Sequence, residues 1–279
     1  MPRQLSTASA LRFQALLLPA LVFAGCSGPG LQLEEWRRAQ TAGLAPTDLS
    51  HGSLAVDLAR IERLRGEGEL DRARAAALAL VQDHAEDAAV LTAASRAESD
   101  AVFLFPEDDK RSRNHAAASA LDYALAAEKH GGLSASDRGQ LAWALGTTTH
   151  LQPMFDRSSH AKRTLETARS ALALDPREPT ALATLALVNL RLETLPWIAS
   201  AMAWTAPDSS LADAERHARA ACESRSSREN LQILAKVLIA AGREPEAREV
   251  LDRALAASAS FPRDRALESA LRKLRASLD

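Results

Sequence analysis

The pattern that most limits the folds open to this chain lies near its C-terminus, where apolar and small residues recur at helical intervals on both sides of one glycine. The pattern consists of Leu231, Leu234, Ala235 and Leu238 before Gly242, and Ala247, Leu251 and Ala254 after it. Intervals of three and four residues place each set on one face of a helix. A glycine between the two sets favours a turn. The sequence therefore predicts a helical hairpin in this region.

Similar alternation of helix and turn runs through most of the chain. We expect helices over 54–64, 70–84, 87–103, 112–130, 136–145, 156–174, 179–193, 211–224, 227–241, 244–257 and 263–278. Ser136 is the expected N-cap of the 136–145 helix, and Gly131 ends the helix before it. Aromatic residues make up only 4% of the chain, and no segment alternates apolar and polar residues in a Val/Ile/Thr-rich context. The predicted fold class is all-α, an α-solenoid of antiparallel helical hairpins.

The spacing in the last hairpin resembles the tetratricopeptide repeat, a 34-residue unit of two helices with small residues at their contact. The resemblance implies that Ala235 and Ala247 lie at this close contact. Leu145-Gly146 resembles the Leu-Gly pair of the first repeat helix, and 171–176 resembles the end of the second helix, with its proline. The resemblance implies a repeat domain over residues 51–279, with insertions after Phe103 and Leu192 that interrupt the register. The alternative is a generic helical bundle.

The N-terminus has the layout of an export signal. A cationic start with Arg3 is followed by an uncharged apolar run over 15–24 and then by Gly25-Cys26. The run is too short to span a bilayer, which needs about 20 apolar residues. Residues 23–26 resemble the bacterial lipobox, which implies a signal peptide over 1–25, lipidation of Cys26 and a linker over 26–50. The implied location is the periplasmic face of a membrane, the outer more than the inner. Ordinary signal cleavage, with Cys26 incidental, is the alternative.

A segment of 14 residues without charge, 194–207, interrupts one hairpin. Its Trp197 and Trp204 are seven residues apart and so share a helical face. The segment and the amphipathic helix after it resemble the family of regulators of microtubule dynamics, which is tetratricopeptide-like. The exported setting resembles instead the T component of TRAP transporters. We expect a short helix with at least one Trp buried, and an exposed partner site is the alternative.

The sequence offers little for catalysis or for cofactor binding. A net charge of −2 gives no global basic field, so we expect no nucleic-acid partner. None of the seven histidines has zinc-ligand spacing, and Ser159-x-x-Lys162 lacks the further elements of a serine acyl-transfer enzyme. We therefore expect no enzyme, no metal and no cofactor. Cys222 has no partner for a disulfide if Cys26 is lipidated, and its helical context predicts a small buried residue.

Two functions remain in competition. The first is a membrane-anchored protein-interaction scaffold of the cell envelope, whose partner the sequence does not identify. The second is a periplasmic ligand-handling subunit of a TRAP-type transporter, which would need a lined cavity. A homo-oligomer is a further option for either. The candidate binding residues are Tyr123, Trp143, Trp197, Met202 and Trp204.

Overall fold

A computed structural model describes residues 53–194 and 209–278 of the chain, and in them it contains eleven α-helices, two short 3₁₀ turns and no strand. The helices are α2 (Leu54–Gly66), α3 (Leu70–Asp83), α4 (Ala88–Ala101), α5 (Lys110–His130), α6 (Ala135–Thr148), α7 (Arg157–Leu174), α8 (Pro179–Glu193), α10 (Leu211–Ser224), α11 (Arg228–Ala240), α12 (Glu244–Ala256) and α13 (Asp264–Ala276). The turns are η1 (Thr149–Leu151) and η2 (Met154–Asp156). The predicted all-α class is confirmed.

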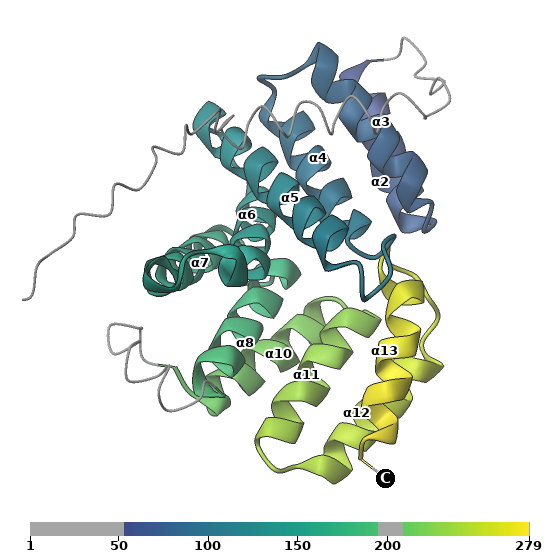
Figure 1. Cartoon of the computed structure of the whole chain (residues 1–279), viewed down its shortest axis with the longest axis vertical. Helices are drawn as coiled ribbons and strands as arrows, with labels where there is room; N and C mark the ends of the chain where they lie inside the picture. The colour runs from purple at the N-terminus through teal and green to yellow at the C-terminus, as the bar shows by residue number, and fades with distance from the viewer. Residues whose placement is uncertain (1–52, 195–208, 279) are drawn as a thin grey trace, which may run out of the picture. The chain divides into compact units, whose positions relative to one another are not determined.

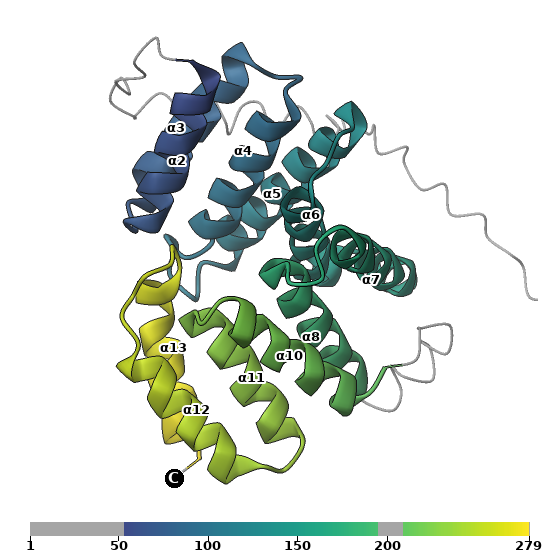
Figure 2. The same ribbon diagram turned by 180° about the vertical axis from the view of Figure 1, so that it is seen from behind.

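The helices form two layers (Figures 1 and 2). The inner layer, as we name it, consists of α2, α4, α6, α8, α11 and α13, and each of these helices contacts the next one in this order. The outer layer consists of α3, α5, α7, α10 and α12, and each of its helices packs on the inner-layer helices before and after it. This repeated stacking of helical hairpins is the arrangement of an α-solenoid, as predicted.

Local signals explain where the helices begin and end. The α6 helix begins after Ser134, whose side chain accepts a hydrogen bond from the Asp137 backbone N–H, while the Asp137 carboxylate accepts one from the Ser134 N–H. This reciprocal capping box makes Ser134 the N-cap, two residues before the expected N-cap, so the prediction of Ser136 as N-cap is wrong. Gly131 follows α5 with φ at 78°, which glycine adopts without steric cost.

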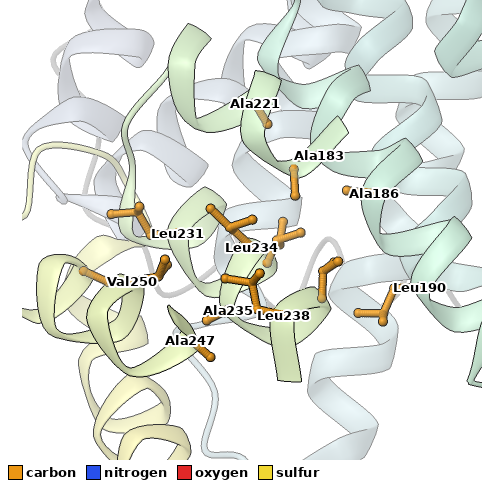
Figure 3. Packing of buried hydrophobic residues seen from close by; sticks show 14 of the residues in the cluster. Ala183, Ala186, Leu190, Ala221, Leu231, Leu234, Ala235, Leu238, Ala247 and Val250 are labelled. Atoms are coloured by element: carbon orange, nitrogen blue, oxygen red, sulfur yellow. The ribbon is translucent and has the colours of Figure 1, made fainter. Parts of the chain in front are cut away.

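The last hairpin has the contact that its sequence predicts. Ala235 of α11 and Ala247 of α12 are both fully buried in one apolar cluster, which also takes residues from α8, α10 and α13 (Figure 3). Close approach also explains Gly146 of α6, since an added Cβ there would lie 3.3 Å from Thr164 and 3.6 Å from Thr184. Small residues thus let neighbouring helices approach closely at several contacts of the two layers.

Candidate functional site

Charged side chains are buried where the start of α13 meets α4 and α11. Asp100 of α4 is 1% exposed, and one of its oxygens lies 2.7 Å from Arg65 Nε of α2. Its other oxygen lies 3.2 Å from the Nε of Arg263, the N-cap residue of α13. Arg263 also pairs with Glu229 of α11 at 2.7 Å. This four-residue network, which we call the closing network, connects four inner-layer helices.

A second set of hydrogen bonds fixes the start of α13. Asp264, which is 1% exposed, accepts hydrogen bonds from the backbone N–H groups of Arg228, Ser260 and Phe261. By contrast, the pair between Lys273 and Glu107 at 2.9 Å is exposed on both sides, and such pairs stabilise little. Buried carboxylates therefore fix the start of α13.

Next to Arg263, inner-layer helices and α5 line an open cavity of about 330 Å³, which we call the inner cavity. Its wall comes from α4 and the turn after it, from α5, α6, η1 and α8, and from the start of α13. The lining residues are Ser99, Val102, Phe103, Arg113, Asn114, Ala117, Trp143, Thr147, His150, Arg191 and Arg263. The volume is at the lower end of the range of small-molecule sites.

Arginines lie over the aromatic rings of this cavity. The Arg263 guanidinium carbon is 4.7 Å from the centre of the Trp143 ring and 5.8 Å from that of Phe103. The guanidinium carbon of Arg113 is 5.9 Å from the centre of the Phe103 ring. Cations at such distances are attracted by the ring quadrupole, by about 0.5–2 kcal/mol. The closing network thus positions a residue that also forms the cavity wall.

Two cations of the cavity wall lack a carboxylate partner in the part of the chain that the structure describes. Arg113 donates to the carbonyl oxygen of Phe105 at 3.1 Å, and Arg191 donates to that of Gly146 at 3.2 Å. The side chain of Arg191 reaches solvent, but the surrounding protein partly desolvates its guanidinium. This desolvation lowers the pKa of Arg191. Burial also lowers the pKa of Lys236 on α11, and the charge of Arg191 lowers it further. Arg191 and Lys236 thus lie close enough for their charges to interact, while Glu229 partly offsets this effect at Lys236.

The sequence-predicted site residues have different locations. Trp143 is 8% exposed and lines the inner cavity. Tyr123 is 4% exposed and lies in a separate apolar cluster with residues of α2, α3 and α4, away from the cavity wall. Cys26, Trp197, Met202 and Trp204 are outside the described residues, and so is the helix expected over 194–207, apart from its first residue. The sequence does not single out four further residues of the cavity wall, because they follow no motif and come from distant segments. These residues are Phe103, Arg113, Arg191 and Arg263.

Metal binding, membrane spanning and thiol reactivity depend on other features of the described residues. Within 53–194 and 209–278 there is no group of three His, Cys, Asp or Glu side chains that could hold a metal ion. Of the helices in those ranges, none has the length and hydropathy needed to cross a membrane. Cys222 is half-buried against the large apolar cluster, and burial raises the pKa of its thiol to about 11. A thiol in this state is a poor nucleophile at neutral pH.

Comparisons with known proteins agree with this architecture. The crystal structure of a thermophilic TPR protein of Thermus thermophilus is similar, with a TM-score of 0.57, 17% sequence identity, and coverage of 80% of this chain and 97% of that chain. At this identity the likeness shows the fold alone, which is tetratricopeptide-like. No protein with a curated description matches the chain. The family model described as regulator of microtubule dynamics protein 1-3 matches residues 57–279. The chain therefore belongs to the family of regulators of microtubule dynamics 1-3.

Proposed function

We propose that the protein is a non-catalytic, membrane-anchored protein-interaction scaffold of the cell envelope. The observation that carries the proposal is the inner layer, which combines a stacked helical surface with a cavity of aromatic and arginine side chains. Stacked helical repeats present extended surfaces for partners. Trp and Arg are the side chains that most often dominate binding energy at interfaces. The tetratricopeptide-like fold favours this role over catalysis.

The inner layer, with the part of the cavity wall that α5 contributes, is the proposed binding surface because it presents cationic side chains outside the apolar packing. Apolar contacts between the two layers account for the packing of the hairpins. Arg113, Arg191 and Lys236 take no part in that apolar packing, and each makes a single described hydrogen bond through its cationic group. Their charges are therefore available to a partner.

Site-specific photo-crosslinking tests where the partner binds. A photoreactive residue is placed at Lys236 of the inner layer, and the matched control is Lys162 on α7 of the outer layer, whose side chain is 63% exposed. We expect an adduct in cells from position 236 and none from position 162. Adducts from position 162 alone would place the partner on the outer layer and refute the proposal. Adducts to a second copy of the chain would identify a homo-oligomer.

The membrane anchor rests on the sequence around Cys26. Each buried CH₂ of an acyl chain contributes about 0.8 kcal/mol, so two or more chains hold a protein on a membrane. Cell fractionation of the wild type and of the Cys26→Ser variant tests this part. We expect the wild type with the membranes and the variant in the soluble fraction. A soluble wild type would show that the chain is not lipid-anchored.

A second function, a ligand-handling subunit of a TRAP-type transporter, is favoured by one observation. The inner cavity is large enough for a small organic molecule and has Trp143 in its wall, as that function requires. The identity of the cross-linked partner separates the two functions. Permease or binding-protein subunits of such a transporter would support the second function, and any other protein would support the general scaffold.

A further inference from the structure

We propose that the inner cavity is a binding site for a carboxylate attached to an apolar group. Arg113 and Arg191 would bind the carboxylate, and Phe103 and Trp143 would contact the apolar part. The proposal goes beyond the scaffold function, because it names a ligand chemistry and a site that need neither the membrane anchor nor a partner protein.

The balance of charge around the cavity favours an anionic ligand. Within the closing network two cations, Arg65 and Arg263, face two carboxylates, Asp100 and Glu229, so the network is neutral as a whole. None of the residues that line the cavity is acidic. Neither Arg113 nor Arg191 has a carboxylate at ion-pair distance among the described residues, and Glu107 interacts with the charge of Arg113 only at longer range, so the wall carries a net positive charge.

The planar shape of the two guanidinium groups also favours a carboxylate ligand. Each guanidinium carries five N–H donors in a planar fork, and such forks match the two oxygens of a carboxylate. Arg113 and Arg191 each use one terminal nitrogen on a backbone carbonyl, so the remaining donors are open to a ligand. Arg113 is half-buried, and partial burial strengthens a charge-assisted hydrogen bond, because water competes less for the donors.

The apolar part of the cavity wall favours an organic acid over an inorganic anion. Val102, Phe103, Ala117 and Trp143 contribute apolar surface to the same cavity. Phosphate or sulfate would leave that surface in contact with water. An organic acid with an aromatic or aliphatic body would cover it, and this burial favours binding. Asn114 and His150, whose side chains lie 3.2 Å apart, add polar groups to the wall.

Two sources can supply this chemistry, a free organic acid or the C-terminal carboxylate of a partner chain. Titration calorimetry on the purified full-length chain at low salt distinguishes them with two matched pairs of probes. The first pair is 3-phenylpropionate and 3-phenylpropanamide. The second pair is a tetrapeptide that ends in phenylalanine, with a free or an amidated C-terminus. Each acid should bind at least about tenfold more tightly than its amide, a difference of about 1.4 kcal/mol.

The comparison between pairs identifies the source. Tighter binding of the free peptide acid than of 3-phenylpropionate would indicate a partner's C-terminus, and the reverse order would indicate a free organic acid. Inorganic phosphate should bind at least about tenfold more weakly than either acid. Equal affinity of acid and amide would overturn the carboxylate assignment, equal affinity for phosphate would overturn the apolar part, and no binding of any acid would overturn the site.

Substitutions locate the site in the structure. Arg191→Gln should weaken binding of the better acid at least about tenfold, and Arg191→Lys, which keeps the charge but loses the fork, should weaken it less. The matched control is Arg169→Gln, which changes another exposed helical arginine at a different cavity, between α7, α8 and α10. Unfolding curves confirm that each variant is folded. Unchanged binding in Arg191→Gln, or an equal loss in Arg169→Gln, would refute this location. Because the assay needs no membrane or partner, its result is independent of the crosslinking result.

Discussion

A single methyl group added at Gly139 should destabilise the protein, although alanine is the better helix former. Gly139 lies within α6, and the side chain of Glu178 packs directly against it. An alanine Cβ at this position would lie 2.7 Å from the Glu178 Cδ atom, which is closer than side chains normally approach. Glu178 is 4% exposed, and its carboxylate caps α8 by accepting from the Ala181 backbone N–H. The added methyl therefore displaces a buried helix cap.

One stabilising and two destabilising contributions decide the sign of the change in the free energy of unfolding. Replacing glycine by alanine inside a helix stabilises by about 1 kcal/mol. Losing an N-cap hydrogen bond costs about 1 kcal/mol. A buried carboxylate without its partners costs about 1–3 kcal/mol more. Burial raises the pKa of Glu178 while the backbone N–H groups of Ala181 and Thr180 lower it, so these bonds do stabilise the charged form. The net expectation is a loss of about 2 kcal/mol, or about 4–8 °C in Tm for a domain of this size.

Thermal and urea unfolding, followed by circular dichroism, measure this change in the free energy of unfolding. Gly66→Ala is the matched control, because Gly66 is also helical and an added Cβ there meets nothing within 4 Å. Gly139→Ala is then repeated in a Glu178→Ala background, where the methyl has room. There it should be neutral or stabilising by up to about 1 kcal/mol. The same destabilisation in both backgrounds would refute the reasoning.

Burial is the basis of three further predictions. Ala247→Leu should overpack the contact with Ala235 and lower the free energy of unfolding by about 1–3 kcal/mol in urea titrations, and an unchanged midpoint would contradict that packing. In a Cys26→Ser variant, Cys222 is the single thiol. At pH 8 it should react with Ellman's reagent about 100-fold more slowly in the folded chain than in the urea-unfolded chain, because a pKa of about 11 leaves little thiolate. Equal rates would disprove the burial of this thiol. Asp100→Asn should lower the free energy of unfolding by about 2–3 kcal/mol in the same urea titrations. This is less than the usual loss for a broken buried ion pair, because Arg65 keeps Glu62 and Arg263 keeps Glu229. An equally stable variant would show that the closing network is dispensable.

Most of the fold could be predicted from the sequence, because the signals that define helical hairpins are local. The α8 and α10 helices begin and end at the residues expected, and Gly242 marks the turn between α11 and α12. Errors arose where two capping residues compete within a few positions. Ser134 and Ser136 are equally good caps by composition, and the choice depends on Asp137, which can complete a capping box with Ser134 alone.

The candidate site could be predicted only in part, because it depends on contacts between distant segments. Trp143 was a candidate for its residue type, and it does line the inner cavity. Arg263 shows no pattern in the sequence that separates it from the other arginines of the chain. Its role emerges only when α13 packs on α11 and its N-terminus reaches α4. Tyr123 has the residue type of a binding-site residue, but it is buried in the core of the first hairpins.

The position of Arg263 connects the stability of the last helix to the chemistry of the inner cavity. The apolar face of α13 packs through Leu267 and Leu271 into the large cluster, which places the N-terminus of the helix beside Asp100 and Glu229. Those carboxylates hold the Arg263 guanidinium over Trp143 and neutralise its charge. Without them, Arg263 would be a third arginine without an ion-pair partner, and it would repel Arg191 and Arg113 and compete with them for an anion. The buried carboxylates of the closing network therefore both hold α13 on the inner layer and restrict the anion-binding charge to two arginines.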